Sequence, residues 1–353
     1  MNDAADSDLG MSPAFLSCNL GKRSITLNLK APQASAIVER LVAGADVVVE
    51  NFRAGVMDKL GFGYPALKSI RPDLIYCSVS GYGQTGPKAG VAAYDGAIQA
   101  DSGMMSITGF PDNGPTRTGY MPVDMATAMN TAFAISVALY RRLNTGEGQR
   151  IDVAMMDTAI VLQTVQISNF LVKGRIPPLQ GNRSPTGHPT ANSFTTADGH
   201  INVLALREPQ VHSLFRIIDR ADAITDPRFS SGPARIANYD ETYQLIAKPL
   251  QEHPSDHWLS AFAADNVPAA AIRDYSKVVS DPQFQHRNLF IDFPAPGNSE
   301  ESITLVRAGY HTDVDSPDTT TPPPTLGQDT DAVLREEGFS VEEIATFRSD
   351  GVI

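Results

Sequence analysis

Strand-like apolar runs alternate with segments of helical periodicity in the first eighty residues of the chain. The runs DVVVEN (46–51) and LIYCSVS (74–80) are short and rich in β-branched or aromatic residues, which is typical of buried strands. The run SITLNL (24–29) alternates and predicts a further strand. Between it and DVVVEN, apolar residues recur at helical spacing over 37–42, and Gly44 ends that predicted helix. Strands that alternate with helices pair in parallel, so the sequence predicts an open parallel α/β sheet.

The pattern changes twice along the rest of the chain. From residue 93 onward it is mostly helical, with two long predicted helices at Met125–Leu143 and Met155–Val172. The Pro- and Gly-rich stretch Lys173–Pro189 then marks a change of domain. We predict a large α/β domain, a smaller α+β domain and a C-terminal segment that returns to the first, at residues 1–175, 176–285 and 286–353.

The charge of the chain limits its partners. The net charge is −12, which argues against nucleic acid as the main partner because phosphate contacts need a basic surface. Residues 1–90 are close to neutral, with nine Lys and Arg against eight Asp and Glu, which indicates either a place for a polyanionic ligand or chance clustering. The apolar stretch Thr131–Leu139 is about half of a membrane span, and the polar N-terminus MNDAADSDLG is no secretory signal. We therefore expect a cytoplasmic enzyme that binds neither membrane nor nucleic acid.

Familiar catalytic motifs are missing from the sequence. The segment GYGQTG (81–86) follows a predicted strand and matches the glycine spacing of a dinucleotide-binding loop, but Pro87 comes next and no helical pattern opens there. We therefore expect this loop to line a ligand site without binding a dinucleotide. The two cysteines and the seven histidines form no metal-ligand spacing, and no Gly-x-Ser-x-Gly elbow exists.

Carboxylates near predicted helix starts are the remaining candidates for chemistry. Asp124 precedes the long helix at Met125, where it is either an N-cap or a carboxylate held ionised by free amides and able to attack an activated acyl group. Asp95 has a similar setting, with Tyr94 beside it. Asp157 is expected to lie on a helix surface or to serve in packing.

Seven segments resemble, in family order, the class III CoA-transferases, a group that also includes α-methylacyl-CoA racemase. Their spacing is nearly that of the family in the first half, and together they run over nearly the whole chain. The matching segments are NLGKRSITLNLK (19–30), ADVVVENFRAGVMDKLGFGY (45–64), IYCSVSGYGQTGP (75–87), AAYDGAIQADSGMMSITG (92–109), GQRIDVAMMD (148–157), VPAAAIRDYSKVVSDPQF (267–284) and PTLGQDTDAVLREEGFS (324–340).

The resemblance implies roles for particular residues. Asp124 falls where the family has its nucleophilic aspartate. The residues that fall where the family lines its CoA site, or lie against CoA or its thioester, are Leu27, Lys30, Asn51, Phe52, Lys59, Leu60, Tyr94 and Met155. The family fold implies a Rossmann-like large domain, a smaller domain and a homodimer of two interlocked rings.

The resemblance also implies a reaction. A class III CoA-transferase moves CoA from an acyl-CoA to a small carboxylic acid through an aspartyl anhydride and an aspartyl-CoA thioester. CoA and acyl-CoA are then substrates, and no tightly bound cofactor or metal is expected. Amides of the GYGQTG loop or of the Gly181 region would stabilise the oxyanions.

Two other functions stay open at this point. The racemase uses a histidine base where this chain has Tyr94, and a phenol with a reference pKa of about 10 is a poor base at neutral pH. The family normally begins with a further strand and helix ahead of the segment where this chain starts. We therefore also consider a misassigned start, or a truncated, non-catalytic paralogue that binds CoA.

Overall fold

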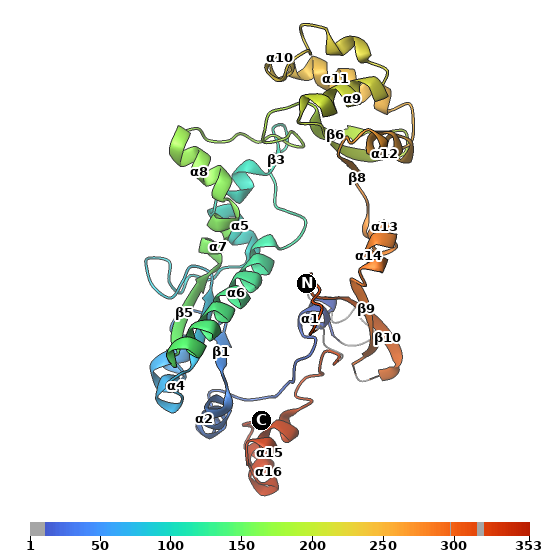
Figure 1. Cartoon of the computed structure of the whole chain (residues 1–353). Coiled ribbons are helices and arrows are strands. Elements are labelled where there is room, and N and C mark those ends of the chain that lie inside the picture. Colours follow the sequence, from blue (N-terminus) through green and yellow to red (C-terminus); the bar gives the residue numbers. More distant parts are fainter. Residues whose placement is uncertain (1–10, 297, 316–320) are drawn as a thin grey trace. The chain divides into compact units, whose positions relative to one another are not determined.

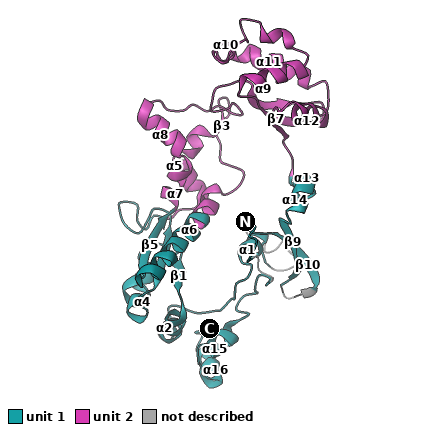
Figure 2. Cartoon of the chain, in the orientation of Figure 1, with its two compact units in different colours: residues 1–91, 129–154, 275–353 teal, residues 92–128, 155–274 magenta. Residues whose placement is uncertain are grey.

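The chain forms two compact units, each described here by itself (Figures 1 and 2). The computed structural model describes residues 11–296, 298–315 and 321–353, so the predicted features of MNDAADSDLG lie outside the described residues. The first unit comprises Met1–Val91, Met129–Ala154 and Tyr275–Ile353, and the second comprises Ala92–Ala128 and Met155–Asp274. The domain limits expected from the sequence stay a prediction.

A three-stranded parallel sheet forms the centre of the first unit. Its strands lie in the order β1 (Val47–Glu50), β2 (Ile75–Ser80) and β5 (Gln149–Ala154). All pairs are parallel, with Val47 opposite Ile75 and Ser80 opposite Ala154. The strands predicted in DVVVEN and LIYCSVS and their parallel pairing are thus confirmed. Strand β5 was not predicted, because polar residues interrupt QRIDVA where a buried strand is expected to be apolar.

Short helices bury their apolar sides around this sheet. They are α2 (Ala34–Gly44), α3 (Val56–Lys59) and α4 (Tyr64–Ile70), whereas α1 (Pro13–Cys18) contacts the strand β10 (Asn298–Val306). The helix predicted to end at Gly44 is confirmed as α2. One buried cluster joins these elements and consists of Ala34, Val42, Phe62, Leu67, Leu74 and Tyr76. The connection from β1 to β2 therefore carries the core that holds the parallel pair together.

The strand predicted over 24–29 is wrong, because this segment is extended but forms no ladder with the sheet. It bonds instead to the C-terminal segment, where Asp329 and Ser24 exchange two hydrogen bonds of 2.8 Å. The Asn28 amide donates to the Val352 carbonyl oxygen over 2.7 Å. The helices α15 (Thr330–Glu336) and α16 (Val341–Ser349) cover this segment with a cluster of Ile37, Leu334, Phe339, Ile344 and Val352. Leu27 of this segment packs against that cluster, and Ile25, Leu27 and Leu29 are each half-buried.

Two short helices and a hairpin also belong to the first unit. The short helices α13 (Tyr275–Val279) and α14 (Pro282–His286) lead to an antiparallel hairpin of β9 (Phe290–Ala295) and β10 (Asn298–Val306). A register shift between Asn298 and Ser302 marks an irregularity in this hairpin.

The second unit contains two groups of elements. The first group is α5 (Asp95–Asp101), a 3-10 turn (Met104–Ile107), the two-residue strands β3 (Gly109–Phe110) and β4 (Gly114–Pro115), α7 (Met155–Leu162) and α8 (Thr164–Lys173). The second group has an antiparallel sheet of β6 (Ala191–Thr195), β7 (His200–Leu204) and β8 (Ala269–Ala271), covered by helices. These helices are α9 (Glu208–Ile217), a 3-10 turn (Ala221–Ile224), α10 (Gly232–Ala237), α11 (Tyr239–Leu250) and α12 (Ser255–Ala264). Their apolar faces share one buried core that includes Phe194, Phe215, Trp258 and Phe262.

The single helix predicted over 155–172 is two helices, α7 and α8, with a break at Gln163. The Gln163 side chain is buried and donates to the carbonyl oxygens of Ala159 and Ser102. This carboxamide therefore links the end of α7 to the residue that follows α5. The apolar periodicity is continuous across the break, which explains why the sequence pattern did not show it.

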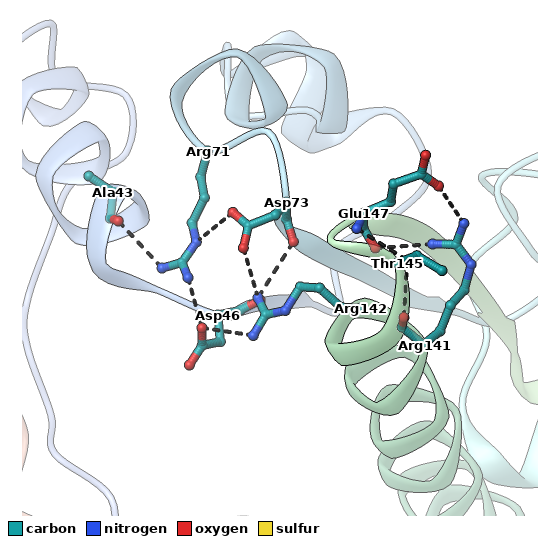
Figure 3. A network of polar contacts seen from close by, with 8 residues as sticks. All are labelled: Ala43, Asp46, Arg71, Asp73, Arg141, Arg142, Thr145 and Glu147. Atoms are coloured by element: carbon teal, nitrogen blue, oxygen red, sulfur yellow. Dashed lines mark hydrogen bonds and ion pairs between the residues drawn. The ribbon is translucent and has the colours of Figure 1, made fainter.

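The helix α6 (Pro122–Thr145) confirms the first long helix predicted from the sequence. Near its end, Arg142 donates to the carboxylate and the carbonyl oxygen of Asp46 over 2.9 and 3.2 Å (Figure 3). Arg71 donates to the same Asp46 carboxylate and to that of Asp73. Since Asp46 precedes β1 and Asp73 precedes β2, this network ties the C-terminal end of α6 to the starts of two strands.

The Arg142 network gives a test of the fold. Arg142→Gln should lower the midpoint of thermal unfolding by roughly 2–6 °C, because it removes hydrogen bonds between segments distant in sequence. Arg141→Gln is the matched control, since Arg141 pairs only with the nearby Glu147 and its side chain is 40% exposed, against 14% for Arg142. Its midpoint should stay within about one degree of the wild type. Equal losses in the two variants, measured by circular dichroism, would contradict the assigned role.

Candidate active site

Asp124 is the third residue of α6, and Pro122 opens that helix. The backbone amides of its first turn donate to another residue, since Val123 and Asp124 both donate to Asp95 Oδ2, over 2.9 and 3.2 Å. Asp124 is therefore not the N-cap of α6, and this alternative from the sequence is wrong. Its side chain is exposed, and no hydrogen bond from a described residue engages its carboxylate oxygens. The carboxylate is available to a ligand.

Asp95, the first residue of α5, performs the capping role. It is 6% exposed, and its Oδ1 accepts a hydrogen bond from Gln99 Nε2 over 2.5 Å. Gln99 Oε1 in turn accepts from the Thr118 amide over 3.1 Å. The sequence analysis placed Asp95 and Asp124 in similar settings, whereas the structure gives Asp95 three donors and leaves Asp124 open. The two carboxylates therefore differ in role. Asp95 caps the start of α6, and Asp124 is exposed to solvent.

This arrangement raises the pKa of the Asp124 carboxyl above its ordinary value. Although the residue as a whole is exposed, partial desolvation of its carboxyl by the surrounding chain is the larger cause, and the negative charge of Asp95 adds to it. The expectation that free helix amides hold Asp124 ionised is thus wrong, because those amides are bound to Asp95. A carboxylate with a raised pKa is more basic, and above that pKa it is the stronger nucleophile.

Tyr94 and Met155 lie in the same unit as Asp124 but differ in exposure. Tyr94 directly precedes α5, and 84% of its surface is exposed. Met155 begins α7 directly after β5 and is buried. Asp157 lies in the first turn of α7, as expected for a residue on a helix. Tyr94 is therefore open to a ligand beside the Asp95 cap, whereas Met155 contributes mainly to the protein interior.

The predicted CoA-site residues of the first unit lie at the carboxyl end of β1 and around one buried cluster. Asn51 directly follows β1, and its side chain donates to the Val79 carbonyl oxygen of β2 over 2.7 Å. The structure thus brings Asn51 and the exposed Phe52 to the carboxyl ends of the strands, where open α/β sheets bind ligands. Leu27 and Leu60 pack against one buried cluster.

The two lysines of this set are both exposed. Lys59 ends α3, next to Leu60, and Lys30 follows the extended segment, where its amide donates to Asn28 Oδ1 over 3.1 Å. Each lysine therefore lies close in sequence to one of the two leucines that share the cluster, Leu27 or Leu60. The first unit thus places two free cations near apolar residues, which suits a ligand with phosphate groups and an apolar portion.

The glycine-rich loop 81–86 is hydrogen-bonded to a side chain of β5. The Gln84 amide donates to Asp152 Oδ2 over 2.9 Å, and the Gly83 amide donates to Ser80 Oγ. A carboxylate against the loop disfavours a phosphate there, and the chain continues without a helix as far as α5. These features disfavour a dinucleotide at the loop. The Gly181 amide is also occupied, by the Gly109 carbonyl oxygen, so none of these three amides is free as an oxyanion donor.

Other reactive groups offer no competing centre in the described part of the chain. Burial raises the pKa of the Cys77 thiol to about 11, which keeps it protonated and unreactive at neutral pH. Among the residues that the structure describes, no three His, Cys, Asp or Glu side chains are grouped as metal ligands. Asp124 is thus the strongest candidate for nucleophilic chemistry.

The profile of CoA-transferase family III matches residues 3–330. The chain belongs to CoA-transferase family III. The resemblance seen in the sequence is thereby confirmed.

Similar family III proteins include transferases of several small acids. The succinate–glutarate CoA-transferase of Agrobacterium fabrum is 37% identical over 293 residues, which is 83% of this chain and 73% of that protein. The acetyl-CoA:oxalate CoA-transferase of Acetobacter aceti is 39% identical over 278 residues, 78% of this chain and 71% of that protein. A CAIB/BAIF family protein from Brucella suis has a similar structure, with a TM-score of 0.82 and 34% identity over 92% of this chain and 83% of that chain.

The coupling of the two carboxylates gives a second test. In Asp95→Asn the pKa of Asp124 should fall, because a negative charge next to it is removed. Titration of protein labelled with carbon-13 at the aspartate carboxyl measures this pKa, and Asp124→Asn identifies the resonance. Asp112→Asn, in the turn between β3 and β4, removes the same charge elsewhere in the unit and should leave that pKa unchanged. An unchanged pKa in a folded Asp95→Asn protein would contradict the coupling.

Proposed function

We propose that this family III protein transfers CoA from an acyl-CoA to a small carboxylic acid, with Asp124 as the nucleophile. The observation that carries the proposal is the exposed, unpartnered carboxylate of Asp124 in the first turn of α6, where Asp95 binds the amides. A nucleophile needs a carboxylate whose position is fixed but whose oxygens are free. Asp124 meets both conditions.

The first half of the reaction consumes the acyl-CoA. An oxygen of Asp124 attacks the thioester carbonyl, which forms an acyl-aspartyl anhydride and releases the CoA thiolate. The thiolate then attacks the aspartyl carbonyl, which forms an aspartyl-CoA thioester and releases the donor acid. Each step exchanges one acyl bond for another, so no oxidant, reductant or metal takes part.

The second half reverses these steps with another acid. The acceptor carboxylate attacks the aspartyl thioester, which forms a second anhydride and releases the thiolate again. The thiolate attacks the carbonyl of the acceptor, which yields the new acyl-CoA and returns Asp124 as a carboxylate. The raised pKa of Asp124 favours its attack on the donor, because a more basic carboxylate is a stronger nucleophile.

Coenzyme A is a substrate in this scheme. Its phosphates would meet Lys30 and Lys59 of the near-neutral first quarter, with Leu27, Leu60, Asn51 and Phe52 along the rest of the molecule. For the acids, the similar proteins act on succinate, glutarate and oxalate, which are small dicarboxylates. We therefore propose small dicarboxylic acids as the acceptors.

Covalent trapping tests the proposal. After incubation with an acyl-CoA, hydroxylamine should leave a hydroxamate on the tryptic peptide 118–141, whose only side-chain carboxylate is Asp124. Asp124→Ala should lose both the label and CoA exchange, with a fall in rate of roughly a thousandfold or more. Asp112→Asn is the control and should keep both.

Three outcomes would contradict the transferase proposal. Exchange that continues with an unmodified peptide excludes Asp124 as the covalent residue. Incorporation of solvent deuterium at the α carbon of a 2-methylacyl-CoA without an acceptor acid would indicate a racemase. CoA binding without either reaction would indicate a non-catalytic paralogue.

We also propose a homodimer, in which a second copy covers the exposed apolar side of α6. The large apolar residues on that side recur every three or four positions and are all exposed, namely Met125, Met129, Phe133, Val137, Tyr140 and Leu143. Helix α8 buries no residue and exposes Val165, Leu171 and Val172. Helices with such faces need a partner in water.

A membrane is the other apolar partner to consider for α6. By length and composition alone α6 could cross a bilayer, a property that the short run Thr131–Leu139 did not indicate. Arg142 near its end is bonded to Asp46 and Asp73 of the same unit, however, and the charged Asp124 lies in its first turn. These polar contacts fit a helix fixed in a folded unit, so a second copy suits its apolar face better.

The dimer proposal predicts a change of mass in solution. Phe133→Glu should shift the protein from dimer to monomer in analytical ultracentrifugation, because a carboxylate at the centre of an apolar interface is costly to bury. Ile236→Glu changes an exposed apolar residue of α10 in the same way and should stay dimeric. A monomeric wild type, or a Phe133→Glu protein that remains dimeric, would contradict the proposal.

A further inference from the structure

The segment 92–128 holds one cation and four acidic side chains. The cation is Arg117, and the acids are Asp95, Asp101, Asp112 and Asp124. A carboxylic acid that approaches Asp124 is an anion, so the charges of this segment repel it. A dicarboxylic acid with two negative charges is repelled more strongly. Binding such an acid next to Asp124 therefore calls for a positive group near the site.

Arg117 lies beside the cap of the Asp124 helix. Its Cδ and Nη1 are both 3.4 Å from the point where a Cβ of Gly96 would stand, and Gly96 directly follows Asp95. The guanidinium therefore packs over the first turn of α5, where a side chain at position 96 would come into contact with it. Gly96 leaves this space to the arginine.

The backbone on both sides of Arg117 is held by hydrogen bonds. The Thr116 amide donates to the Thr108 carbonyl oxygen over 2.7 Å, and the Thr118 amide donates to Gln99 Oε1 over 3.1 Å. Gln99 is the residue that also donates to Asp95. One chain of hydrogen bonds thus connects the backbone next to Arg117 with the cap of α6. The backbone on both sides of the arginine is therefore tied to the elements that hold the start of α6.

The charge of Arg117 is not neutralised within the chain. No hydrogen bond or ion pair joins its guanidinium to another described residue, and the side chain is exposed. The neighbouring Asp95 cannot easily serve as its partner, because its two oxygens already accept from Gln99, Val123 and Asp124. The N–H donors of the guanidinium are therefore available to bind the carboxylate of a ligand.

A dicarboxylic acid has two carboxylates, and the separation of Arg117 from Asp124 decides which of them the guanidinium would bind. No hydrogen bond or ion pair joins Arg117 to Asp124, both of which the structure describes, so the guanidinium is not in direct contact with that carboxylate. The reacting carboxylate must come within about 3–3.5 Å of the carbonyl formed on Asp124. Arg117 is therefore placed to bind the carboxylate at the far end of the acid, which does not react.

We propose that Arg117 binds the distal carboxylate of a dicarboxylic acid substrate while the near carboxylate reacts at Asp124. This inference rests on the proposed CoA transfer and adds to it the group that selects the acid. Arg117 would neutralise one of the two charges and hold the chain of the acid in line with the nucleophile. A monocarboxylic acid of equal length would gain nothing from it.

A matched pair of acceptors tests the proposal. With one acyl-CoA donor, kcat/KM is measured for succinate against butanoate and for glutarate against pentanoate. Arg117→Gln should reduce the ratio of dicarboxylate to monocarboxylate by roughly tenfold to a hundredfold, because a charged hydrogen-bond pair is lost. The change should lie mainly in KM for the dicarboxylate, since the contact is the same in ground and transition states.

Lys248→Gln on α11 is the control, because it removes the same charge from an exposed position of the second unit and should leave the ratio unchanged. Arg117→Lys keeps the charge but loses the planar fork, so it should lower the ratio severalfold. If Arg117→Gln does not fold, as judged by circular dichroism, Arg117→Lys decides the question, and an unchanged ratio overturns the proposal.

The outcomes separate this inference from the function on which it rests. If the wild type transfers CoA and the ratio does not change in Arg117→Gln, or falls equally in Lys248→Gln, the inference is overturned and the proposed function stands. If the wild type transfers no CoA to any of these acids, the proposed function and the inference are both overturned.

Discussion

The hydrogen bonds that Asp95 accepts from the first turn of α6 are the constraint on which the candidate site depends. Asp95 occupies the amides of Val123 and Asp124, so the carboxylate of Asp124 has no role in capping and stays free. Its charge also raises the pKa of Asp124, which makes that carboxylate more basic. A buried acid thus positions an exposed one and increases its reactivity.

The same constraint organises the charges around the site. Gln99 connects Asp95 to the backbone beside Arg117, so one network of hydrogen bonds joins the cap of the helix that carries Asp124 to the segment that carries Arg117. In the first unit, Lys30 and Lys59 stand in a segment that is close to neutral within an acidic protein. Lys30 and Lys59 are both exposed there, which suits the binding of an anion.

Local sequence patterns predicted the central helices and strands but not the contacts between segments that are distant in sequence. β1, β2 and the helix ending at Gly44 were found because each has an uninterrupted apolar pattern with a clear end. The segment 24–29 has the pattern of a strand, but it is covered by helices from the far end of the chain. The cap by Asp95 joins residues 28 and 29 positions apart, and no local pattern encodes such a contact. The candidate nucleophile was therefore predicted by resemblance, and the structure shows that its carboxylate is exposed and accepts no hydrogen bond from a described residue.

The most direct measurement of the central claim follows oxygen atoms into Asp124. When the acceptor acid carries oxygen-18 in its carboxylate, the second anhydride leaves one heavy oxygen on Asp124 as the thiolate attacks the acceptor carbonyl. Mass spectrometry of peptide 118–141 after turnover should therefore show oxygen-18 on its only side-chain carboxylate. A peptide that stays unlabelled while heavy acid is converted to acyl-CoA would contradict a mechanism through Asp124.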